Sequence, residues 1–138
     1  MSCRPARPVA AVVAAAAVGS AGCGLNVQSP DLFQLTRVGA GQKLTLLVND
    51  GGTVSCNGGA SKSLPDPLLL RARDLATTLD GDAKSGRRFA GTGAGVYRYT
   101  VRLQDGMISF PDTAAARYPE LAQTELLALQ IANGPCGR

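Results

Sequence analysis

Cysteine is the residue type of this sequence with the widest choice of chemistry, and it occurs at Cys3, Cys23, Cys56 and Cys136. A thiol can be acylated, can bind a metal or can form a disulfide bond. No Cys-x-x-Cys pair occurs and the chain lacks histidine, so neither a redox motif nor the usual zinc ligand set is present. Without histidine, the general base of a Ser-His-Asp hydrolase is also missing. We therefore expect no metal, no cofactor and no enzymatic activity.

The first 22 residues have the three parts of an export signal. Arg4 and Arg7 stand near the start, an apolar run covers residues 9–18, and small residues cover 19–22. As a helix, this apolar run would rise only about 15 Å, which is about half of a bilayer core. We therefore expect cleavage after residue 22 rather than a permanent transmembrane anchor.

The end of this segment, Ser20-Ala21-Gly22-Cys23, resembles the lipobox of bacterial lipoproteins, which ends in two small residues and a cysteine. The resemblance implies that Cys23 receives diacylglycerol, becomes the first mature residue and anchors the protein to the extracytoplasmic face of the cell membrane. Ser20 stands where leucine is most usual in that family. Because Ser20 and Gly22 also suit an ordinary signal peptidase, plain secretion is the alternative.

The remaining cysteines fit this interpretation. Cys3 leaves with the signal and acylation uses Cys23, so that Cys56 and Cys136 remain. An even pair in an exported protein predicts a structural disulfide, which here would close a loop of about 80 residues. Without acylation, three cysteines would remain and one thiol would have no role.

A chain of 138 residues has room for one domain. We expect a cleaved signal at 1–22, a lipid-anchored tether at 23–31 and a single domain at 32–138. The formal net charge of +4 falls to +2 when Arg4 and Arg7 leave with the signal. Such a small charge gives no indication of nucleic-acid binding.

Alternating apolar and polar residues predict strands at 32–38, 43–48, 53–56 and 96–104, with a further strand after the turn at Asp105-Gly106. One helix is expected from Asp66, as N-cap, to a stop at Gly81, and another from Pro119 to Gly134. This order predicts an α+β fold, a small two-layer sandwich with an antiparallel sheet of about five strands and two helices on one face.

The turns also predict strand registers. A three-residue loop at 50–52 would pair Val48 with Val54 and Leu46 with Cys56, whereas a two-residue turn would pair Val48 with Thr53. We favour the first register, because it places apolar residues on one face. The Asp105-Gly106 turn predicts two further pairs: Leu103 with Ile108, and Val101 with Phe110.

Two segments are candidates for a binding surface. The 14-residue connection at 82–95 carries Arg87, Arg88 and an exposed-looking Phe89. Arg98 and Arg102 lie on the polar side of the strand at 96–104, where they would meet an acidic partner or anionic lipid headgroups. The alternatives are a solvated loop and an ordinary solvated strand face. The glycines at 39–41 and 91–95 precede strands, so they indicate turns rather than phosphate loops.

The domain has a second resemblance, which covers residues 32–131. FQLTRVGAG, YRYTVRLQDGMISFPD and the leucine-rich last helix are similar in order to emfourin-like proteins, which inhibit thermolysin-type metalloproteases. That family usually has a double glycine after the first strand, where this chain has Gly39-Ala40-Gly41, and the expected disulfide is an addition. No inhibitory residue is carried over.

The sequence therefore predicts an exported, lipid-anchored lipoprotein of the cell envelope that acts as a non-catalytic binding or accessory module. Its expected contacts are the membrane, through the lipid on Cys23, and an envelope protein or protease. The alternatives are an extracytoplasmic protease inhibitor and a secreted enzyme.

Overall fold

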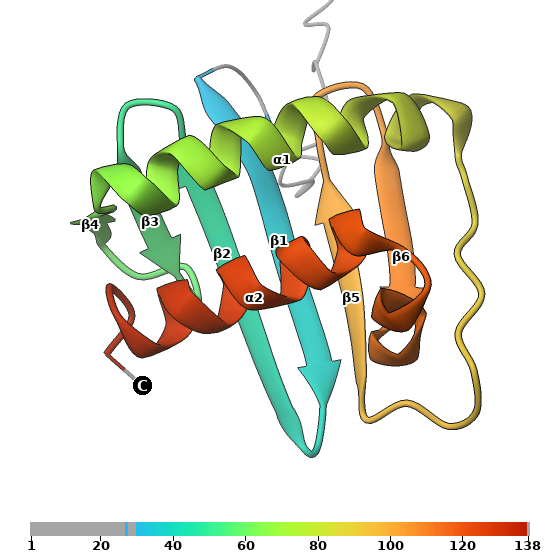
Figure 1. Cartoon of the computed structure of the whole chain (residues 1–138). Coiled ribbons are helices and arrows are strands. Elements are labelled where there is room, and N and C mark those ends of the chain that lie inside the picture. The colour runs from blue at the N-terminus through green and yellow to red at the C-terminus, as the bar shows by residue number, and fades with distance from the viewer. Residues whose placement is uncertain (1–26, 28–29, 138) are drawn as a thin grey trace, which may run out of the picture.

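The computed structural model describes residue 27 and residues 30–137, and these form an α+β domain (Figure 1). The elements follow in this order: β1 (Asp31–Gly39), β2 (Gln42–Asn49), β3 (Thr53–Cys56), β4 (Ser61–Ser63), α1 (Asp66–Ser85), β5 (Tyr97–Arg102), β6 (Met107–Pro111), the short 3-10 helix η1 (Asp112–Ala116) and α2 (Pro119–Asn133). Cys23 and the expected export signal lie outside the described residues.

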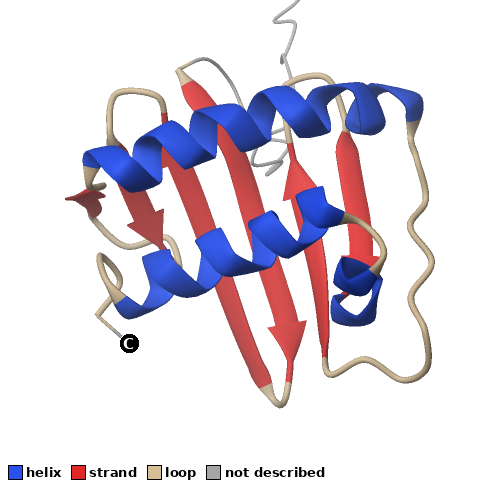
Figure 2. Ribbon diagram, in the orientation of Figure 1, coloured by secondary structure: helices blue, strands red, loops and turns tan. Residues whose placement is uncertain are grey.

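The strands form one open antiparallel sheet in the order β4-β3-β2-β1-β5-β6. Both helices cross the strands on the same side of this sheet (Figure 2). Alternation along each strand sends one set of side chains into the core beneath the helices. The fully buried members of this set include Phe33, Leu35, Leu44, Leu46, Val48, Val54, Val101, Ile108 and Phe110. The predicted fold class is confirmed.

The hairpin of β2 and β3 has the predicted register, with Val48 opposite Val54 and Leu46 opposite Cys56. The sheet has six strands, one more than the five expected, because β4 pairs with β3 at the edge. All three residues of β4 are exposed. A short polar edge strand has no buried face, and therefore no alternation from which to predict it.

The hairpin of β5 and β6 has a different register from the one predicted. Val101 lies opposite Ile108 rather than Phe110, and Leu103 lies outside β5, in the connection to β6. The Leu103 N–H donates to the Gly106 carbonyl oxygen at 2.8 Å, so the two turn residues are Gln104 and Asp105 rather than the expected Asp105 and Gly106. The observed pairing differs from the predicted one by two residues, so each side chain still points to the predicted side of the sheet. The apolar residues of β5 therefore remain opposite those of β6.

Helix α1 begins and ends elsewhere than predicted. Asp66 is its first residue, not its N-cap, and that position belongs to Pro65. The helix continues through Gly81 to Ser85, because this extra turn buries Ala83 against the core. Gly86 ends it with φ of 63°, a left-handed conformation that glycine adopts without steric cost. Helix α2 has its predicted boundaries.

A disulfide bond joins Cys56 and Cys136, as predicted, with 5.8 Å between their Cα atoms. The bond connects the end of β3 to the residues that follow α2. Within the described part of the chain, no helix is long and apolar enough to cross a membrane.

Candidate functional site

The predicted binding residues do not lie together. Arg87, Arg88 and Phe89 belong to the segment between α1 and β5. This segment is shorter than the expected 82–95 connection, because residues 82–85 belong to α1. Arg98 and Arg102 lie on β5 and alternate with the buried Tyr99 and Val101, so they face away from the helices. The predicted surface therefore divides into two separate regions.

Phe89 is buried, with 5% of its surface exposed, so its prediction as an exposed contact residue is wrong. Its ring packs edge-on against Phe110 and Tyr118, with centroids 6.4 and 5.0 Å away. The guanidinium of Arg87 covers the rings of Phe89 and Tyr118 at 4.7 and 5.2 Å. These partners are distant in the sequence, which explains why local pattern did not reveal the burial.

Arg87 also connects this segment to both helices through polar contacts. Its Nη1 atom donates to Asp82 Oδ1 at 3.0 Å and lies 3.9 Å from Glu120 Oε1. Phe89 therefore belongs to the core, whereas Arg87 stabilises the connection with 44% of its side chain still exposed. Arg88 remains exposed, and no ion pair joins it to the described acidic residues.

The sheet side that faces away from the helices, here called the open face, carries three rows of side chains across β2, β1, β5 and β6. The register gives the rows as Lys43, Val38, Arg98 and Pro111; then Thr45, Thr36, Thr100 and Ser109; then Leu47, Gln34, Arg102 and Met107. Arg98 and Arg102 were predicted on this face. Lys43 was not predicted there, because its position in the same row as Arg98 depends on β1 lying between β2 and β5.

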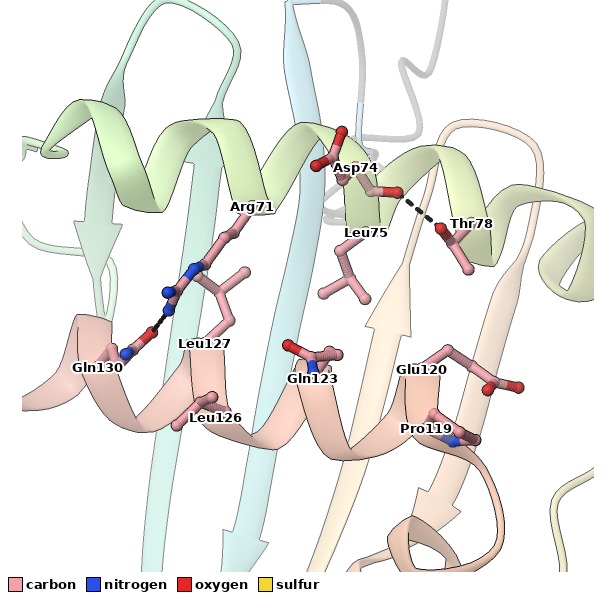
Figure 3. A pocket seen from close by; sticks show the side chains of 10 residues that line it. All are labelled: Arg71, Asp74, Leu75, Thr78, Pro119, Glu120, Gln123, Leu126, Leu127 and Gln130. Atoms are coloured by element: carbon pink, nitrogen blue, oxygen red, sulfur yellow. Dashed lines mark hydrogen bonds between the residues drawn. The ribbon is translucent and has the colours of Figure 1, made fainter.

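A groove of about 450 Å³ lies between α1 and α2 (Figure 3). Its lining comes from both helices: Arg71, Asp74, Leu75, Thr78, Pro119, Glu120, Gln123, Leu126, Leu127 and Gln130. Arg71 Nη1 donates to Gln130 Oε1 at 2.8 Å across one end of the groove. Leu75 and Leu127 are buried, whereas Leu126 is 43% exposed. The volume and apolar lining suit a ligand or a partner side chain.

The groove could not be predicted from the sequence. Each helix showed its own apolar stripe, but the residues that border a groove depend on how the two helices pack over the sheet. The only sequence signal is an excess of leucine on the last helix, where Leu126 and Leu129 lie beyond the buried stripe.

A buried polar cluster lies between the sheet and α2. Asp112 Oδ2 accepts hydrogen bonds from the N–H groups of Val96 and Tyr97, both at 3.1 Å. Burial, together with the negative charge of Asp112, raises the pKa of Glu125 to about 7. Burial and the Glu125 charge likewise raise the pKa of Tyr99.

Glu125 Oε1 and Asp112 Oδ1 are buried without a hydrogen-bond partner. A carboxyl group that titrates near neutrality can act as an acid or a base. Neither Glu125 nor Asp112 lines the groove between the helices, however. The cluster is therefore better suited to setting the pH dependence of stability than to catalysis.

No metal site is present among the described residues: no group of three or more His, Cys, Asp or Glu side chains could hold an ion. The acidic side chains of Asp80 and Asp105 approach each other, but Lys84 Nζ lies 2.7 and 3.4 Å from their oxygens. The lysine neutralises that region.

Comparison with known proteins identifies no relative. No protein-family model, curated protein or solved structure matches the chain at a significant level.

Proposed function

We propose that the chain is an exported, lipid-anchored protein of the cell envelope that acts as a non-catalytic binding module. The observation that carries the proposal is the bond between Cys56 and Cys136. Structural disulfides persist in oxidising, extracytoplasmic compartments and are rare where thiols are kept reduced. The bond also uses both cysteines that follow Cys23.

That pairing supports a separate role for Cys23. The residues before it, Ser20-Ala21-Gly22, have the small side chains of a lipobox, and an apolar run precedes them. Diacylglycerol on the Cys23 thiol would supply two acyl chains, which hold a protein stably at a membrane where a single chain does not.

The intact mass of the protein from its native host, with and without reductant, tests this proposal. We expect the mass of a chain that starts at Cys23 and carries diacylglycerol, with a gain of about 2 Da when the disulfide is reduced. The Cys23→Ser variant is the matched control and should lose the lipid. A lipid-free mature mass would favour plain secretion, and an uncut chain would contradict export.

The binding role is best tested at the groove between α1 and α2. A photo-cross-linking residue in place of Leu126 should capture one defined envelope protein in living cells. The same residue in place of Leu70, which is 58% exposed and outside the groove lining, is the control. Capture from both positions, or from neither, would contradict binding at the groove. A captured metalloprotease would favour the inhibitor alternative.

A further inference from the structure

We propose that the open face of the sheet docks on the anionic lipid headgroups of the membrane that holds the anchor. This inference deepens the proposed function and rests on it, because the lipid on Cys23 places the face beside a membrane. Three properties of the face support the inference: its charge, its exposed apolar side chains and its distance from the anchor.

The three rows of the open face hold three basic side chains and no acidic one. Lys43, Arg98 and Arg102 are exposed on the open face, and no ion pair joins them to the described acidic residues. Helices α1 and α2, on the other side of the sheet, hold six acidic residues and three basic ones, Arg71, Arg73 and Lys84. A basic face opposite an acidic one would orient the domain at an anionic surface.

The three cations are spread out rather than convergent. Arg98 and Arg102 are four residues apart on β5, which corresponds to about 13 Å along a strand. Lys43 lies two strands from Arg98 in the same row, roughly 10 Å away. Such spacing suits several headgroups side by side better than one small anion, which needs donors that converge.

Exposed apolar side chains accompany these charges. Val38 and Met107 are 50% and 47% exposed on the open face, and Val96, which directly precedes β5, is 61% exposed. A shallow hollow brings Val38, Val96 and Arg98 together in its lining. Apolar side chains beside basic ones are typical of surfaces that bind at the membrane interface, where both kinds of contact contribute.

The anchor lies within reach of this face. Seven residues, 24–30, separate Cys23 from β1, and they span at most about 23 Å. Strand β1 lies between β2 and β5, the two strands that carry the three cations. A membrane that holds the lipid is therefore close enough to the face for contact.

Vesicle binding by the lipid-free chain tests the inference separately from the anchor. The chain from residue 23 with Cys23→Ser would be mixed with phosphatidylcholine vesicles that contain about one third phosphatidylglycerol. Each basic side chain contributes roughly fivefold at such a surface, so Arg98→Glu with Arg102→Glu should weaken binding at least about 25-fold. Arg88→Glu, at an exposed position outside the strands of the open face, is the control and should bind like the parent chain.

Retention of the disulfide and of the circular dichroism spectrum would show that the double variant is folded, and a Gln substitution at both positions gives a milder second variant.

Binding that disappears in high salt and needs the anionic lipid supports the inference. Equal binding of the parent and both double variants, or no binding at low salt, would overturn it. Binding to soluble polyanions but not to vesicles would also overturn it. The two proposals can be contradicted independently. The mass of the native protein tests the lipid anchor on Cys23, and vesicle binding by the lipid-free chain tests the open face.

Discussion

The disulfide between Cys56 and Cys136 connects residues 80 positions apart and joins β3 to the end of the chain. It closes most of the domain into one covalent loop. In the chain-entropy view, such a loop restricts the unfolded state and so raises the free energy of unfolding.

Replacing both cysteines by serine should therefore lower the free energy of unfolding by about 4 kcal/mol, measured by urea unfolding. Reductant should lower the stability of the parent chain by a similar amount and leave the double variant unaffected. Cys23→Ser, outside the loop, is the control. An unchanged midpoint in the double variant would mean that the bond contributes nothing to stability.

The core and most of the sheet could be predicted because alternation and turn residues are local signals. Leu44, Leu46 and Val48 are buried as their spacing indicated, and the loop at 50–52 determined their partners. The register of the β5–β6 hairpin was not predicted correctly from its turn residues. Gly106 packs so closely on α1 that an added Cβ would collide with the backbone of Ala83. This contact joins distant parts of the chain, so no local pattern in β5 reveals it.

The candidate sites were less predictable for the same reason. Arg98 and Arg102 could be assigned to a polar strand face, because alternation alone requires it. Phe89 is apolar among charged residues, so only its distant partners Phe110 and Tyr118 reveal its burial. The groove between α1 and α2 depends on the packing of two helices, and the expected export signal lies outside the described residues.

Phe89→Ala should destabilise the domain rather than abolish a binding surface. The substitution removes a buried ring from contact with Phe110 and Tyr118 and leaves a cavity, which typically costs about 3–5 kcal/mol. Urea unfolding would measure this loss. Arg88→Ala, at the exposed neighbouring position, should change stability by less than about 0.5 kcal/mol. Equal effects from the two variants would contradict the buried role of Phe89.

Asp112→Asn should loosen the connection that leads into β5. The carboxylate accepts two backbone N–H groups at Val96 and Tyr97, and an amide oxygen accepts less strongly than a charged one. We expect a loss of about 1–2 kcal/mol in unfolding free energy and faster amide exchange at these two positions. Asp74→Asn, on the exposed side of α1, should leave both unchanged. Unaltered exchange at Val96 and Tyr97 would show that Asp112 does not hold the segment.

Glu125 should make the domain less stable as pH rises. Burial and the charge of Asp112 raise its pKa from 4.5 to about 7, so the folded state favours the protonated carboxyl group. Below about pH 4.5 both states are protonated and the group costs nothing. Between about pH 4.5 and 7 the unfolded state loses its proton first, so stability falls, and the full penalty applies above about pH 7.

Glu125→Gln removes this penalty. Since the side chain is partly exposed, we expect a gain of about 2 kcal/mol at pH 8, no gain at pH 4, and a flatter stability profile between them. Asp112→Asn should lower the pKa of Glu125 by removing the neighbouring charge, and so shift the fall in stability to lower pH. Asp74→Asn should keep the parent profile. A gain from Glu125→Gln that is equal at pH 4 and pH 8 would mean that packing, not ionisation, limits stability at this position.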